Sequence, residues 1–101
     1  MVSRNTVMLS GTLIGREELR HTPAGMPALN FRIGHASEQL EAGHARTVRL
    51  ELDAVALGNV AEQLSRTPLQ GEYGFEGFLA LRGKLGRLPV LHVTRFELNR
   101  G

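Results

Sequence analysis

The chain has no cysteine and no tryptophan, and only one of its 12 cationic side chains is a lysine. The absence of cysteine excludes disulfides, thiolate-bound zinc, iron–sulfur clusters and a cysteine nucleophile. Long apolar runs are also absent: the run at residues 54–57 is far shorter than the about 20 residues of a transmembrane helix or the apolar centre of a signal peptide. We therefore expect a cytoplasmic protein without a membrane partner, stabilised by packing alone.

Length and composition predict one folded domain. The 101 residues are 42% hydrophobic and 22% charged, which is ordinary for a globular protein and unlike a disordered one. Compact domains cluster at about 100 to 150 residues, so we expect a single domain over residues 1–101.

The charges are unevenly distributed along the chain. Residues 1–50 carry six cations and four anions, residues 51–81 one and five, and residues 82–101 five and one. If the two ends meet in the fold, they form a basic surface that suits a polyanion. Scattered, solvated charges would explain the same counts equally well until the fold is known.

Alternation of apolar and polar residues predicts five strands. In the second strand, for example, Leu29, Phe31 and Ile33 share one face, while Arg32 lies on the other. The parity of the third strand changes near Val55, which predicts a bulge there. The predicted strands are residues 6–14, 28–35, 47–57, 72–81 and 88–98.

The segments between these strands predict turns, loops and one short helix. Residues 22–27 contain two prolines and a glycine, as a tight turn requires, whereas residues 37–45 have no apolar period and predict an exposed loop. Residues 58–65 form the helical candidate, with Asn59 as its cap and Glu62 in the position of a capping box. Gly11, inside the first strand, predicts a bulge or a close backbone approach.

The order of these elements predicts an all-β protein. Five strands with one short helix between strands 3 and 4 is the arrangement of the OB-fold, a five-stranded Greek-key barrel. Curling the sheet into a barrel also buries the apolar face that a flat sheet of this size would leave open. An SH3-like barrel is the main alternative, but the position of the helix speaks against it.

Several stretches together resemble the bacterial primosomal replication protein N (PriB) family, whose members are homodimeric OB-fold relatives of single-stranded-DNA-binding protein. The resemblance covers nearly the whole chain and implies a role in replication restart: binding single-stranded DNA and linking the primosomal helicase to the next loading factor. The stretches that carry it are residues 5–13, 23–27, 41–43, 77–79 and 90–92.

One difference from the family affects the expected binding site. In the family, aromatic side chains near the start of the third strand stack on bases, whereas His44 and Arg49 occupy the matching positions here. A guanidinium plane also stacks on a base and adds charge attraction. We therefore expect binding that depends more on salt and less on aromatic stacking. The basic loop before the fifth strand is retained as Arg82, Lys84 and Arg87.

Candidate DNA-binding residues follow from the predicted fold. Arg32 and Arg49 fall on the outward face of strands 2 and 3, the face that OB-folds use for oligonucleotides, and the basic loop overhangs the same face. Arg16 and Arg95 could equally well pair with Glu17, Glu18 or Glu97 as surface ion pairs of little energetic worth. The full candidate set is Arg20, Arg32, His44, Arg46, Arg49, Arg82, Lys84 and Arg87.

The remaining residues predict neither catalysis nor a cofactor. Glu51 and Asp53 lie on a sheet face without a histidine partner, and the histidines lack neighbours at metal-ligand spacing. Four aromatic side chains are expected in the core, whereas Phe78 has the opposite parity and is a candidate dimer contact. Two other functions stay open, namely a protein-interaction scaffold with weak DNA binding and an RNA-binding OB domain.

Overall fold

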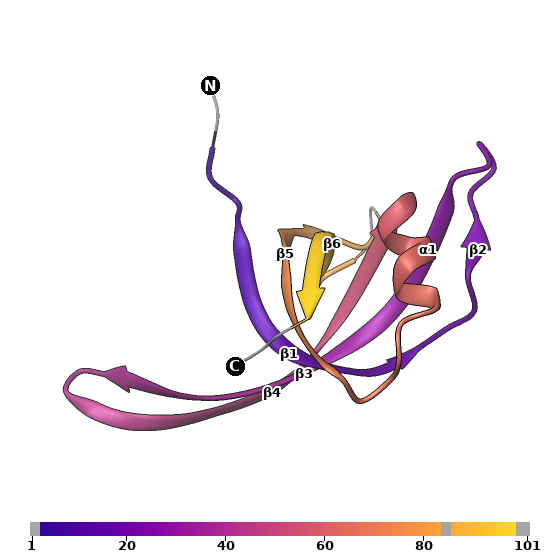
Figure 1. The fold of residues 1–101 in the computed structure, drawn as a ribbon. Coiled ribbons are helices and arrows are strands. Elements are labelled where there is room, and N and C mark those ends of the chain that lie inside the picture. Colours follow the sequence, from indigo (N-terminus) through magenta and orange to yellow (C-terminus); the bar gives the residue numbers. More distant parts are fainter. Residues whose placement is uncertain (1–2, 84–85, 99–101) are drawn as a thin grey trace.

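The computed structural model describes residues 3–83 and 86–98, which form one sheet and one short helix (Figure 1). All five expected strands are present, and the two-residue strand β2 is added at the edge of the sheet. The elements are β1 (Val7–Arg16), β2 (Arg20–His21), β3 (Pro27–Glu41), β4 (His44–Leu57), α1 (Asn59–Ser65), β5 (Glu72–Leu81) and β6 (Pro89–Leu98).

The sheet closes into a five-stranded barrel because β1 pairs on both of its sides. The strand order is β1-β5-β6-β4-β3, and β3 returns to pair with β1. β4 and β6 are parallel, through the pairs Ala54–Leu91 and Val55–His92, whereas the other neighbours are antiparallel. A closed barrel of this order, with its helix between β4 and β5, is consistent with an OB-fold.

The inward faces of the strands form one hydrophobic core. Phe31 packs 6.1 Å from Phe75, and Tyr73 meets Phe75 and Phe96 edge to face at 6.1 and 6.0 Å. Three of these rings are buried and Phe96 is half-buried, so the expected core aromatics are confirmed. Leu64 of α1 is also fully buried in this core.

Two glycines allow neighbouring strands to approach closely. A Cβ on Gly11 would lie 2.5 Å from Cγ2 of Ile33 and 2.6 Å from the carbonyl oxygen of Gly34, which confirms the predicted close approach. The β1 bulge itself lies further along, where the pairing with β3 shifts between Leu13 and Gly15. At the β5–β6 bulge, a Cβ on Gly77 would overlap the backbone of β6.

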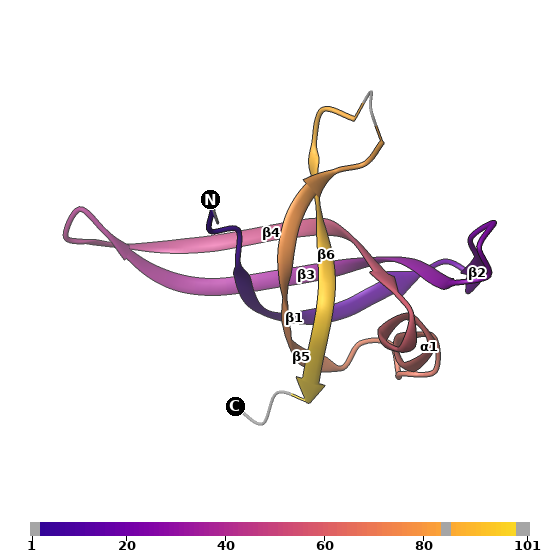
Figure 2. The same ribbon diagram turned by 90° about the horizontal axis from the view of Figure 1, so that it is seen from above.

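The prediction of a loop at residues 37–45 is wrong, because β3 and β4 continue as a paired hairpin. Their register runs without a shift up to the pair Glu41–His44, and the turn residues Ala42 and Gly43 have φ of 52° and 81°. Two positive φ values are typical of a two-residue type I′ turn. We call residues 35–50 the arm, which extends away from the barrel (Figures 1 and 2). Most of the arm is exposed. Backbone hydrogen bonds between β3 and β4 hold it together, so its sequence needs no apolar period and shows none that would predict strands.

The bulge expected near Val55 is also wrong. The one-to-one register of β3 and β4 continues through this region, and Ala54 and Ala56 keep the inward parity. Val55 is buried on the opposite face of β4. The apparent change of parity therefore reflects a strand that is covered on both faces at its end.

The helix forms where predicted, but Asn59 does not cap it. Gly58 is the N-cap residue, with φ of 73°, and its carbonyl oxygen accepts a hydrogen bond from the Glu62 amide at 3.2 Å. The left-handed conformation of Gly58 brings Asn59 into the first turn, where no side-chain cap forms. Within residues 3–83 and 86–98, no helix is long and apolar enough to cross a membrane.

Candidate nucleic-acid interface

The outward face of the β3–β4 ribbon carries two of the predicted DNA-binding arginines. Arg32 pairs with Asp53 across the two strands, and four residues further along β3, Ala36 pairs with Arg49. Directly paired residues of antiparallel strands point to the same side of the sheet, and every second residue repeats that side. Arg32 and Arg49 therefore share this face, as expected, although Arg49 lies in the arm.

The described residues of the loop after β5 lie at the barrel end of the same face. Arg82 lines a hollow of about 430 Å³ together with Arg32 and Asp53. A second hollow of about 360 Å³ is lined by Arg82, Arg87 and Asp53. The structure therefore brings the loop arginines to Arg32, whereas Lys84 lies outside the described residues.

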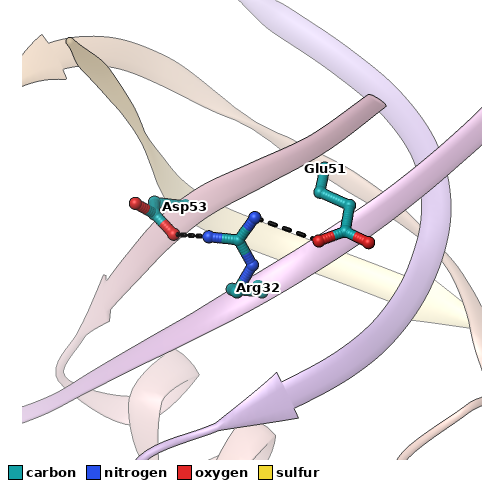
Figure 3. A network of polar contacts seen from close by, with 3 residues as sticks. All are labelled: Arg32, Glu51 and Asp53. Carbon is teal, nitrogen blue, oxygen red and sulfur yellow. Dashed lines mark hydrogen bonds and ion pairs between the residues drawn. The ribbon is translucent and has the colours of Figure 1, made fainter. Parts of the chain in front are cut away.

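Arg32 is held by two carboxylates, as Figure 3 shows. Its guanidinium donates hydrogen bonds to Glu51 at 3.1 Å and to Asp53 at 2.5 Å. The hydrogen bond to Glu51 and the charge of Asp53 raise the pKa of Arg32. A phosphate must therefore compete with two anions at this arginine. Alternation in the sequence places Glu51 and Asp53 on one face of the third strand, but only the β3–β4 register shows that they lie beside Arg32.

Arg20 joins the loop arginines from β2. It lies in β2, which pairs with β3 through Arg20–Ala28 and His21–Pro27. A third hollow, of about 270 Å³, is lined by Arg20 and Arg82 among other residues. Four cations from distant segments thus surround one region, and we call Arg20, Arg32, Arg82 and Arg87 the loop group.

The other three described candidates lie along the arm and not in the loop group. Arg49 lines a hollow of about 510 Å³ at the base of the arm, together with Glu51 and Glu72. Arg46 pairs with Glu41 at 2.7 Å, and the register places it on the opposite face from Arg49. His44 is the first residue of β4, beside the turn of the arm. We call His44, Arg46 and Arg49 the arm group.

Among the described residues, Arg95 forms no ion pair with Glu97, and Arg16 forms none with Glu17 or Glu18. The Arg16 guanidinium donates hydrogen bonds to the carbonyl oxygens of Leu64, at 3.3 Å, and Thr67. Leu64 lies in the last turn of α1 and Thr67 just beyond its end, and the Leu64 carbonyl also accepts a hydrogen bond from the Thr67 amide at 3.3 Å. Arg16 thus ties β1 to the helix, a contact between residues 48 and 51 positions apart that no local pattern reveals.

His35 connects the arm to the barrel, a role that the sequence analysis missed. Its Nδ1 donates a hydrogen bond to the carbonyl oxygen of Ser10 at 2.6 Å, and its Nε2 lies 2.8 Å from Oγ of Ser37. Ser10 belongs to β1 just before the β1–β3 pairing begins. The imidazole therefore holds the arm where the two strands diverge. Across the described parts of the chain, no three histidine, aspartate or glutamate side chains gather as metal ligands.

Comparison with known proteins places the chain among replication proteins. A family model described as "Another single-strand binding protein family" matches residues 5–95. Replication restart protein PriB from Bordetella pertussis is 50% identical over 91 residues, which are 90% of this chain and 85% of that protein. The solved structure of PriB from Ralstonia solanacearum superimposes with a TM-score of 0.90 at 32% identity, covering 97% of this chain and all of that one.

The fold of this chain also resembles that of a more distantly related solved structure. A single-stranded DNA binding protein from Thermus aquaticus superimposes with a TM-score of 0.75 at 23% identity, covering 97% of this chain and 51% of that one. The family model, the 50% identical relative and the PriB structure agree with the closed barrel described above. The chain therefore belongs to the PriB family of replication restart proteins, a family with an OB-fold related to that of single-strand binding proteins.

Proposed function

We propose that this protein is a single-stranded-DNA-binding accessory of the replication-restart primosome. The observation that carries the proposal is the loop group, in which four arginines from β2, β3 and the β5–β6 loop surround the outward face of an OB barrel. OB-folds use this face and its overhanging loops for oligonucleotides. Membership of the PriB family supports the same role.

The binding is proposed to be independent of base sequence. Arginine presents a planar fork of donors that matches a phosphate, and each neutralised phosphate releases counterions from the strand. Arg32 contributes less than Arg20, Arg82 and Arg87, because Glu51 and Asp53 already hold its guanidinium. Lys84 adds a further cation to the basic loop.

The arm is the second part of the proposed DNA-binding surface. Arg49 is exposed on the outward face of β4, where its guanidinium is available to stack on a base. Arg46 and His44 lie toward the end of the arm on the face opposite to Arg49, so a strand that contacts all three passes around the arm. Arg46 is paired with Glu41, so it contributes less than Arg49.

We also propose that the protein is a homodimer that links the primosomal helicase to the next loading factor in the cytoplasm, without enzymatic activity. β1 pairs with β3 only from Thr12 onward, so the edge of its first half lies outside that pairing, and Met8 beside it is 77% exposed. An unpaired edge and an exposed apolar side chain both favour an isologous contact between copies.

A scaffold with weak DNA binding is the second candidate. Two observations favour it: carboxylates pair with Arg32 and Arg46, and the described residues of the arm carry no phenylalanine, tyrosine or tryptophan. In that case the helicase would bind equally well with and without DNA, and the affinity for oligonucleotides would be low.

The test is a competition titration with labelled oligo-dT at fixed salt. Unlabelled oligo-dT and other single-stranded DNA should compete alike, whereas duplex DNA should compete poorly. Equal competition by duplex would contradict the proposal, and stronger competition by RNA would favour an RNA-binding OB domain. Measuring helicase binding without DNA separates the scaffold from the DNA-binding accessory.

A further inference from the structure

A hollow of about 270 Å³ lies beside Arg82 and Gly83, just after β5, and part of its lining is apolar. Val55 and Leu57 of β4 line it together with His92 of β6. Arg20 and Arg82 also line it. The hollow thus combines apolar side chains, an aromatic ring and two cations.

Strand pairing places the ring of His92 on the outward face of the barrel. His92 pairs with Val55 across β4 and β6, and with Phe78 across β5 and β6. The rings of Phe78 and His92 are stacked, with centroids 4.9 Å apart and planes at 10°. Phe78 therefore fixes the orientation of the imidazole beside Val55. Phe78 itself is 39% exposed, so the pair lies at the surface.

The charge around this hollow differs from that around Arg32. The 430 Å³ hollow is lined by Glu17 and Asp53 as well as by arginines. Among the described residues that line the 270 Å³ hollow there is no carboxylate. A polyanion therefore meets net positive charge in this hollow, although Arg82 also lines the two hollows that Asp53 lines.

We propose that this hollow is a base subsite that takes one unpaired nucleobase of single-stranded DNA. The base lies on Val55, Leu57 and the ring of His92, and its flanking phosphates contact Arg20 and Arg82. Stacking on a ring combined with cations along the backbone is how sequence-independent proteins hold single strands. The inference rests on the proposed DNA binding and assigns a ring contact to β6, outside the arm.

The test compares oligo-dT with an abasic deoxyribose-phosphate chain of equal length. Both are titrated against the wild type, His92→Ala and His92→Phe, with His21→Ala as the control because His21 is exposed and outside the hollow. His92→Ala should reduce the preference for oligo-dT over the abasic chain about five- to tenfold and leave abasic binding unchanged. His92→Phe should keep the preference, and His21→Ala should behave as the wild type.

An unchanged preference in folded His92→Ala would overturn the subsite while leaving the DNA-binding function intact. A wild type that binds neither chain would overturn both proposals.

A second variant covers the case in which His92→Ala does not fold. Leu57 is 46% exposed, so Leu57→Glu places a carboxylate in the hollow without burying it. Leu69→Glu is the matched control, because Leu69 is 44% exposed and does not line the hollow. Leu57→Glu should weaken oligo-dT binding at least fivefold relative to this control, and equal affinities would overturn the subsite.

Discussion

Substitutions at Arg49 test whether its guanidinium stacks on a base. Arg49→Lys keeps the charge but removes the planar group, so it should bind oligo-dT markedly more weakly than the wild type. Arg49→Trp should restore or raise the affinity, because stacking a base on an aromatic ring contributes about 1 to 3 kcal/mol. Fluorescence anisotropy of a labelled oligonucleotide measures both. Near-normal binding by the lysine variant would indicate a phosphate contact. Equal affinities of the wild type and both variants would show that Arg49 does not contact the DNA.

Replacing Gly77 tests the close approach of β5 and β6 at their bulge. A Cβ at this position would overlap the carbonyl of His92, which belongs to the backbone and cannot rotate away. Gly77→Ala should therefore lower the free energy of unfolding by about 2 to 4 kcal/mol, measured by chemical denaturation. Gly74→Ala, in the same strand, is the control, because its nearest neighbour is a Glu97 side-chain atom at 3.9 Å. Equal stability of the two variants would contradict the close approach.

The turn of the arm is the element whose sequence fits its conformation least. Ala42 has φ of 52°, a left-handed conformation that costs a non-glycine residue roughly 1 kcal/mol, whereas asparagine followed by glycine is preferred in type I′ turns. Ala42→Asn should therefore stabilise the arm by about 0.5 to 1 kcal/mol. Slower amide hydrogen exchange in residues 37–48 would show this. Unchanged exchange there would mean that the turn does not limit opening of the arm.

The elements with one buried face were predictable from the sequence, and the arm was not. Alternation located the barrel strands because Phe31 and Phe75, for example, lie on faces that pack into the core. The arm has no buried face, and its turn lacks the asparagine or aspartate that usually precedes the glycine of a type I′ turn. The sequence of its paired strands is therefore like that of an exposed loop.

The candidate site was predictable in its residue types but not in its pairings. Arginines on the outward face and on the β5–β6 loop follow from the fold, whereas the contacts of Arg32 with Glu51 and Asp53 depend on the register of two strands. The hydrogen bonds of Arg16 to the end of α1 join distant segments. Such contacts appear only when the chain is folded.

At the scale of the whole molecule, the proposed dimer depends on the surface beside the first half of β1. Met8→Glu should shift the protein toward monomer, because a charge would then face the contact between copies. Leu40→Glu is the matched control, since Leu40 at the far end of the arm is also 77% exposed. Sedimentation at micromolar concentration and physiological salt measures both variants. A monomeric wild type would contradict the dimer. Dissociation of both variants would show that the contact is not confined to the surface beside β1.

The central claim is that cations around the outward face of the barrel bind the backbone of single-stranded DNA. The most direct measurement is the affinity for labelled oligo-dT as a function of salt, for the wild type and for the variant with Arg82, Lys84 and Arg87 all replaced by alanine. Single strands release about 0.7 ion per neutralised phosphate, so the triple replacement should weaken binding and reduce the logarithmic salt slope by about 2. Arg66→Ala, at the end of α1, should leave the slope unchanged. An unchanged slope in the correctly folded triple variant would contradict the account.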